Sequence, residues 1–489
     1  MERIMDNTNT HPRKLTLSDL RGQIVGIDTL VPLLDGSERP YVFLDNAAST
    51  PTFTQVLTCV EKFLPWYSGV HRGTGFKALV ATEVFDRAHD IVGSFLGADL
   101  TTNHVIFTKN TTECVNKLAN RFAFSADDIV ITTAAEHHSN LLPWRRYAKV
   151  IHVGITKDGY IDLAELKRLL QKFAGQVKLV AVTGASNITG ICSPIHEIAE
   201  WAHAAGAKIF VDAAQLVPHR PVTMLPDDHP QHIDFLAFSA HKMYAPFGIG
   251  VLVGPMSFFA GGEPDIVGGG VVDIVTLDDV VWNETRHKDE AGSPNVVGGV
   301  ALAEAINILK GVGMDAIAAH EKHLLEYAFA RLKKIDSLTF YGPTDSSADK
   351  VGVIAFTVDG MHHALVAAIL GAEWGIGVRN GYFCAQPYVK KLLNVSPEDE
   401  ATGCGISGDK SNVPGMVRAS FGCYTNEDDI DLFVEAMKRI VRKEYAGEYI
   451  QDASSGAFAP KGMVFSLKKY FPFFDSEATA VERSYSEAS

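Results

Sequence analysis

Short apolar runs alternate with longer amphipathic stretches from Tyr41 to about Val253. The runs are nearly continuous rather than alternating in polarity, which is typical of strands covered on both faces. They are Val105–Phe107, Asp128–Thr132, Leu179–Thr183, Lys208–Val211 and Phe235–Phe238. Between them lie segments with helical spacing, such as Thr82–Leu96 and Ile195–Ala205. Strands that recur with intervening helices predict βαβ units, and therefore an α/β fold with a mostly parallel sheet.

The pattern changes after a Gly-rich, mixed stretch that spans residues 261–299. Helical spacing then returns, followed by a strand-like run and two further helical segments. These are Val300–Leu309, Met314–Lys334, Val351–Val358, His362–Leu370 and Glu427–Lys443. We therefore expect a large α/β domain over 41–305 and a smaller α+β domain that combines 21–40 with 306–447. Residues 1–20 are expected to be a flexible lead-in, 394–415 a polar loop, and 448–489 an extension that the pattern does not place.

Composition and charge narrow the class of protein. The chain is 46% hydrophobic and 21% charged, as in ordinary globular proteins, and its net charge of −14 argues against nucleic-acid or anionic-membrane binding. No apolar run reaches the roughly 20 residues that span a bilayer, and the start lacks the apolar core of a secretory signal. The six cysteines are scattered, which suggests neither a disulfide framework nor a zinc site. We expect a cytoplasmic protein without a metal.

The segment Phe235–Val253 has the strongest chemical signal. An apolar strand leads into Ser239-Ala-His-Lys242, and a second apolar strand follows Gly248. A lysine between two buried strands is an unusual place for a solvated charge, whereas a Schiff-base lysine must be held there and lose its proton easily. The alternative is a surface lysine at the tip of a hairpin.

Other polar residues also follow apolar runs, where open parallel sheets bind ligands. Asp212 follows a strand, where its carboxylate could either pair with the pyridine nitrogen of a bound cofactor or cap the N-terminus of a helix. Thr111 and Thr112 stand at the start of a predicted helix, where they suit either a phosphate or capping. His137 and His138 form an adjacent pair, but no further ligand follows at metal-site spacing, so a ring stacked on a cofactor is the alternative to a plain polar residue.

In their order, these segments resemble the class V aminotransferase superfamily of pyridoxal 5′-phosphate (PLP) enzymes, and within it the group II cysteine desulfurases and selenocysteine lyases. The resemblance runs from about Tyr41 to Ile440. The motifs that carry it are Leu44–Ser49, Val70–Gly73, Thr111–Glu113, Glu136–His138, Ser186–Asn187, Asp212–Gln215, Ser239–Lys242, Glu290–Asn295, Arg379–Cys384 and Val417–Ser420. It implies fold type I of the PLP-dependent transferases.

The resemblance also implies how PLP is held. Lys242 would carry the cofactor as a Schiff base and then move protons on the substrate. His137 would stack on the ring, and Asp212 would pair with its nitrogen. The remaining cofactor contacts implied are Gln215 and Asn187 at the phenolic oxygen, Thr111, Thr112, Ser239 and His241 at the phosphate, and Ser293 at the phosphate of the neighbouring subunit. A homodimer with shared sites is therefore expected.

The same resemblance points to an α-amino acid substrate. Arg418 matches the arginine that clamps the substrate carboxylate, a role that suits the planar fork of a guanidinium. Asn46 and Arg379 match positions near the substrate, although both residues suit structural roles equally well.

Cys384 decides the expected reaction. In the desulfurases a loop cysteine attacks the substrate sulfur, which gives a persulfide and alanine. Gly381 and Pro387 predict a loop, which favours a reactive thiol over a buried structural cysteine. We therefore expect a cysteine desulfurase or C–S lyase, with a sulfur-acceptor protein as a further partner.

Some features depart from the group II pattern. This chain has Gly381-Tyr-Phe-Cys384 where those enzymes carry Gly-His-His-Cys, and it adds the polar segment 394–415 and a long tail. The alternative hypothesis is therefore a class V epimerase or aminotransferase-like enzyme in which Cys384 is not catalytic. A non-catalytic scaffold is disfavoured because Lys242, Asp212 and Arg418 occur together.

Overall fold

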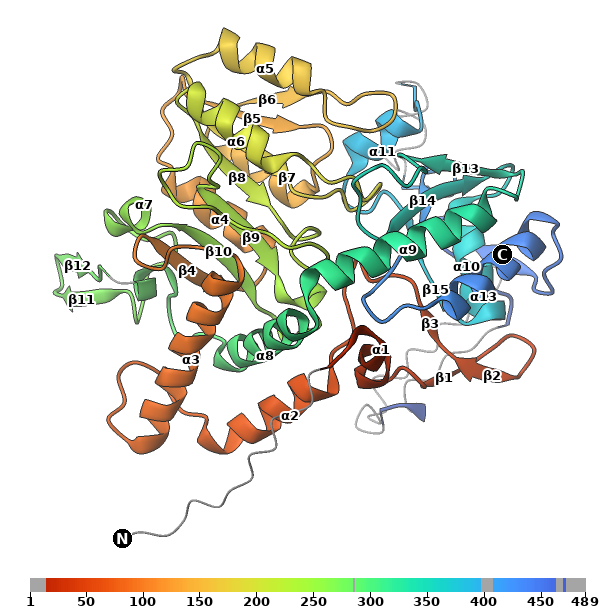
Figure 1. Cartoon of the computed structure of the whole chain (residues 1–489), viewed down its shortest axis with the longest axis horizontal. Helices are drawn as coiled ribbons and strands as arrows, with labels where there is room; N and C mark the ends of the chain where they lie inside the picture. The colour runs from red at the N-terminus through yellow and green to blue at the C-terminus, as the bar shows by residue number, and fades with distance from the viewer. Residues whose placement is uncertain (1–14, 285, 397–407, 463–468, 472–489) are drawn as a thin grey trace.

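The computed structural model describes residues 15–284, 286–396, 408–462 and 469–471. Its largest feature is a seven-stranded sheet in the order β4-β10-β9-β8-β7-β5-β6 (Figure 1). The strands are β4 (Asn103–Thr108), β5 (Ile129–Thr133), β6 (Lys149–Val153), β7 (Val177–Thr183), β8 (Lys208–Asp212), β9 (Phe235–Ser239) and β10 (Gly250–Pro255). Only β10 runs antiparallel to its neighbours in this sheet. The predicted mostly parallel α/β sheet is confirmed.

Helices cover both faces of this sheet, which explains the continuous apolar runs. Phe235 and Ala237 of β9 pack with α4 (Thr111–Arg121) on one face, whereas Leu236 and Phe238 belong to the larger core on the other. Successive side chains of a strand point to opposite faces, so burial on both sides leaves no polar alternation. The larger core also includes α2 (Thr54–Phe63), α3 (Phe76–Phe95), α5 (Leu163–Lys172), α6 (Ile195–Ala204) and α8 (Val296–Val312).

A second sheet has a core of its own. It is antiparallel, in the order β13-β14-β17-β16, and α9, α10 and α13 contribute to the same core. The elements are β13 (Leu338–Tyr341), β14 (Val353–Val358), β16 (Arg379–Gly381), β17 (Met416–Ser420), α9 (Met314–Leu332), α10 (His363–Trp374) and α13 (Glu427–Val441). Helices α8 and α9 link the two sheets and bend by 75° on either side of Gly313 (Figure 1). The exact domain boundaries stay a prediction.

Shorter elements complete the described chain. They are α1 (Leu17–Leu20), β1 (Leu30–Pro32), β2 (Glu38–Pro40), β3 (Val42–Phe43), α7 (Met256–Ala260), β11 (Val272–Val275), β12 (Val280–Trp282), β15 (Ile376–Gly377), α11 (Gln386–Leu392), β18 (Tyr449–Gln451) and β19 (Phe458–Pro460). The last two form a hairpin within the extension that the sequence pattern left unplaced. Much of the expected lead-in, of the polar loop 394–415 and of the tail lies outside the described residues. In the described part of the chain, no single helix is long and apolar enough to span a membrane, although α8 and α9 together meet that test by length and composition.

Candidate active site

A cavity of about 330 Å³ opens where strands of the large sheet end. Thr183, Asp212 and Ser239 end β7, β8 and β9 and line it, and His137 follows β5. Ligands are expected at this edge of an open α/β sheet. The cavity brings together most of the site residues predicted from the sequence: Thr111, Thr112, His137, Asn187, Asp212, Gln215, Ser239, His241, Lys242, Arg379, Cys384 and Arg418.

Lys242 lies in the short 3-10 helix Ala240–Lys242, directly after β9. Burial lowers the pKa of its amine to about 8, while the negative charge of Asp212 acts in the opposite direction. A lysine with such a pKa yields the free amine easily at physiological pH, which a Schiff-base lysine requires.

Asp212 and His137 line the same cavity, and burial shifts the pKa of each. Burial raises the pKa of Asp212, whose Oδ1 accepts a hydrogen bond from the N–H of Ala214 at 3.1 Å. Burial, and then the charge of Lys242, lowers the pKa of His137 to about 3, so its imidazole is neutral. Because Nδ1 of His137 accepts from the N–H of Ser139 at 3.1 Å, its proton is assigned to Nε2.

The N-terminus of α4 lines the cavity. The N–H of Thr111 donates to Oγ of Ser239 at 2.8 Å, and the hydroxyl oxygens of these residues are 2.6 Å apart. Asn110 caps the helix by accepting from the N–H of Glu113 at 3.0 Å, so capping by Thr111 is wrong as an interpretation. Hydroxyl groups at a helix N-terminus, where the helix dipole is positive, suit a phosphate group.

Two arginines that line the cavity pair with one carboxylate. Arg418, on β17, is 2% exposed and donates from Nη2 to Oδ1 of Asp45 at 2.9 Å. Its Nη1 donates to the carbonyl of Asn187 at 3.0 Å, while its Nε has no hydrogen-bond partner among the described residues. Arg379 pairs with the other oxygen of Asp45, Oδ2, at 2.8 Å, and its side chain is half exposed. No role was predicted for Asp45, although it stands within the Leu44–Ser49 motif.

Cys384 is exposed and lies on a loop with an unusual backbone. Phe383 and Cys384 both have left-handed φ values, +50° and +56°. Such angles are costly for residues other than glycine, and surrounding contacts must hold them. The N–H of His138 donates to the carbonyl of Cys384 at 2.7 Å, and the side-chain amide of Asn187 donates to the carbonyl of Phe383 at 2.8 Å.

Two predicted residues lie outside the cavity lining. Asn46 is 1% exposed, and its amide donates to the carbonyls of Phe43 and Ser420 at 3.0 and 3.1 Å. Its Oδ1 accepts from the hydroxyl of Tyr424 at 2.9 Å, so the side chain is used within the fold. Ser293 is exposed, in the segment before α8, and does not line the cavity of its own chain.

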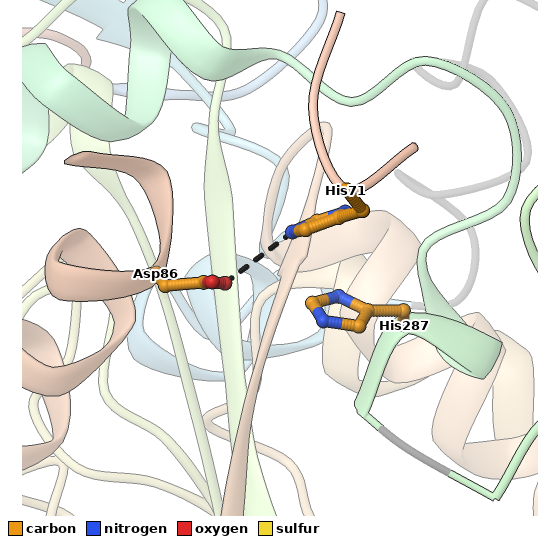
Figure 2. A group of neighbouring side chains, drawn as sticks. All are labelled: His71, Asp86 and His287. Atoms are coloured by element: carbon orange, nitrogen blue, oxygen red, sulfur yellow. Dashed lines mark hydrogen bonds and ion pairs between the residues drawn. The ribbon is translucent and has the colours of Figure 1, made fainter. Parts of the chain in front are cut away.

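A separate polar group joins the Val70–Gly73 motif to α3 and to the segment before the Glu290–Asn295 motif. Figure 2 shows His71 beside Asp86 of α3, with Nε2 3.3 Å from Oδ1, and the ring of His287 against that of His71. The two ring centroids are only 3.8 Å apart. The rings are tilted by 39° to each other, and one ring nitrogen of each histidine and a carboxylate oxygen of Asp86 lie within 4.8 Å of one another. We interpret the group as a polar contact between the Val70–Gly73 turn, α3 and the segment before Glu290.

Comparisons with known proteins agree with this fold. The Aminotransferase class-V family matches residues 42–433. A cysteine desulfurase of Haloferax volcanii is 36% identical over 414 residues, which cover 82% of this chain and 90% of that protein. A cysteine desulfurase of Dickeya dadantii is 35% identical over a stretch that covers 83% of this chain and 93% of that protein. The apo structure of a cysteine desulfurase from Thermococcus onnurineus has a TM-score of 0.73 at 32% identity, covering 82% of this chain and 95% of that one.

The sheet order, the flanking helices and the site at the strand ends define fold type I of the PLP-dependent transferases. Within that fold, the chain belongs to the aminotransferase class V family, in agreement with the resemblance of its motifs.

Proposed function

We propose that this protein is a PLP-dependent cysteine desulfurase that converts L-cysteine to L-alanine and leaves the sulfur as a persulfide on Cys384. The observation that carries the proposal is the position of Cys384. Its exposed thiol lines the same cavity as the buried amine of Lys242 and the buried guanidinium of Arg418. Relatives about 35% identical over most of their length are cysteine desulfurases, which supports the same reaction here.

The lining residues fit PLP. Asp212 offers a buried carboxylate for the pyridine nitrogen. Gln215 donates from its amide to the carbonyl of Ala47 at 2.6 Å and has a side-chain oxygen without a partner among the described residues, which can accept from a phenolic hydroxyl. The neutral ring of His137 suits stacking on the cofactor, and Lys242 suits its covalent attachment. Thr111, Thr112, Ser239 and His241 would hold the phosphate, and Gln215 and Asn187 would hold the phenolic oxygen. When bound, PLP supplies an electron sink for the bonds around the substrate Cα.

Residues of the chain would bind the substrate, transfer protons and attack the substrate sulfur. Arg418 would bind the substrate carboxylate, and its unpartnered Nε provides a donor that Asp45 and Asn187 do not use. Lys242 would take and return protons at the substrate carbons. The thiolate of Cys384 would attack the substrate sulfur, so an S–S bond forms as the Cβ–S bond breaks. Protonation of Cβ then gives alanine, which balances the reaction.

We also propose that the protein works as a homodimer. Hairpin β11–β12 carries apolar side chains on its surface, with Ile274 and Val275 61% exposed and Leu277 fully exposed. Exposed apolar patches of this kind mark protein–protein contacts. Ser293, which follows this hairpin and does not line its own cavity, would then contact the phosphate in the partner subunit.

The test is a steady-state assay with L-cysteine on PLP-loaded protein, following alanine and sulfide in the presence of a reductant. We expect wild type to form both products in equal amounts, and Cys384→Ala to lose at least about 100-fold in rate because its nucleophile is gone. Cys192→Ala, which removes another free thiol, is the control. Unchanged turnover in Cys384→Ala would refute the proposal, and racemised cysteine without sulfide would point to an epimerase.

A further inference from the structure

A second cavity, of about 920 Å³, adjoins the outer side of the Cys384 loop. Its two walls are the segment 138–145 and helix α11. His138 joins the walls: its N–H donates to the carbonyl of Cys384 at 2.7 Å, and its Nε2 accepts from the N–H of Gln386 at 3.2 Å. His137 and Cys384 line the inner cavity, whereas His138 and Gln386 line the outer groove. Cys384 therefore stands at the boundary between the two.

Two exposed basic side chains, those of Arg145 and Lys391, line the outer groove. No carboxylate is among its described lining residues. Arg145 and Lys391 are exposed, and their positive charges add to the effect of burial in lowering the pKa of His152. Leu142, on the same wall, is 50% exposed. The two exposed basic side chains of this groove contrast with the net charge of −14 of the whole chain.

We propose that this groove receives the sulfur acceptor, and that the acceptor is a protein whose thiol lies on a segment flanked by carboxylates. The inference rests on the proposed function. The inner cavity, at about 330 Å³, has room for a cofactor and an amino acid but not for a polypeptide, so the acceptor must approach from outside. Opposite charge across a rim raises the rate of encounter and fixes its orientation.

The transfer is balanced without a further reagent. The acceptor thiolate attacks the outer sulfur of the Cys384 persulfide and forms a new S–S bond. The bond to Cys384 breaks, and the Cys384 thiolate leaves, ready for the next substrate. The outer sulfur keeps its proton, so the acceptor carries the persulfide away.

The experiment measures docking separately from desulfuration. Two peptides of equal length carry one cysteine, activated as a 2-thiopyridyl disulfide and flanked either by Asp and Glu or by Lys and Arg. Cys384 of the PLP-loaded protein displaces pyridine-2-thiol, whose release gives the capture rate, and Cys384→Ala gives the background from other thiols. We expect the acidic peptide to be captured about 10-fold faster at low salt, with the preference disappearing at about 1 M salt.

Charge-reversal variants test whether the preference for the acidic peptide comes from the groove. We expect Arg145→Glu/Lys391→Glu to abolish the preference for the acidic peptide, while Lys310→Glu, an exposed site on α8, retains it. The net charge of −14 alone predicts the opposite, faster capture of the basic peptide. A basic-peptide preference in wild type, or an acidic preference that survives the double reversal, would overturn the proposal.

A separate measurement, which does not depend on peptide capture, tests the proposed function. Persulfide formation from L-cysteine, measured on the same preparations without any peptide, tests desulfuration. Its absence alongside a retained acidic preference would refute the desulfurase reaction and leave the groove as a docking site. Its presence without that preference would refute the groove alone.

Discussion

At the scale of single residues, Asp45 compensates the buried charge of Arg418. Arg418 is 2% exposed, and Asp45 is the carboxylate that pairs with it. Removing one partner of a buried ion pair leaves an uncompensated charge. We therefore expect Asp45→Ala to lower the free energy of unfolding by about 3 kcal/mol.

The matched control for that prediction is Arg379→Ala, which removes the other partner of Asp45. Because the Arg379 side chain is 52% exposed, its loss should cost less than about 1 kcal/mol. Urea unfolding of the three proteins makes the comparison. Equal losses in the two variants would contradict the role given to Asp45.

The amine of Lys242 should set the pH dependence of cofactor attachment. Its pKa is lowered to about 8 mainly by burial, so the free amine is a minority below that pH and dominant above it. We expect PLP uptake by the apoprotein, followed by visible absorbance, to rise about tenfold per pH unit below pH 7 and to level off above about pH 8. If the rate of PLP uptake kept rising to pH 10, the pKa of Lys242 would not be lowered.

The lowered pKa of Lys242 also makes the stability of the apoprotein depend on pH. The unfolded chain keeps the Lys242 proton up to about pH 10.4, whereas the folded apoprotein releases it near 8. The unfolded state therefore binds more protons between these values, and this residue's contribution to stability rises with pH across that window.

The site residues that could be predicted from the sequence are those that follow apolar runs. His137, Asp212 and Lys242 could be predicted because the strand ends fix their places in the sheet. Asp45 could not, since its partner Arg418 is 373 positions away and only the tertiary fold brings the two together. Asn110 was not singled out as the cap of α4, because Thr111 is also suited to that role and spacing alone does not choose between neighbours.

At the scale of elements, the loop that carries Cys384 stores backbone strain. Cys384 has φ of +56°, which glycine adopts without the penalty that a Cβ brings. We expect Cys384→Gly to be more stable than Cys384→Ala by about 1 kcal/mol, the reverse of the usual order, in urea unfolding. Neither variant has the thiol, so the comparison isolates the backbone.

The reference for that comparison is an exposed helical position. At Lys310 of α8, the alanine variant should be the more stable of the two by about 1 kcal/mol. If alanine were also favoured at position 384, the left-handed loop would not persist in solution.

Elements were predictable where local pattern and burial agree. The predicted strand Phe235–Phe238 corresponds to β9 and the predicted helix Ile195–Ala205 to α6, each within one residue at its ends. Hairpin β11–β12 was missed because its residues are mostly exposed and no buried face imposes a period on the sequence. The left-handed turn at Phe383 was also beyond reach, because neither Phe nor Cys indicates such a conformation.

At the scale of the whole molecule, the exposed hairpin predicts association. Leu277 is fully exposed in the single chain. If it lies at the centre of the dimer contact, Leu277→Asp should weaken the dimer at least about 30-fold in sedimentation equilibrium. Val25→Asp, at a less exposed site in the N-terminal segment, should leave the dimer intact. A variant that dimerises like wild type would place the interface elsewhere.

The central claim is that sulfur from L-cysteine passes to Cys384. It is tested most directly by mixing PLP-loaded protein with one equivalent of L-cysteine without reductant, alkylating the thiols, and mapping them by mass spectrometry. We predict one additional sulfur atom on the peptide that contains Cys384, formed together with one equivalent of alanine. Alanine formed while the extra sulfur is found on another cysteine, or on none, would contradict the account.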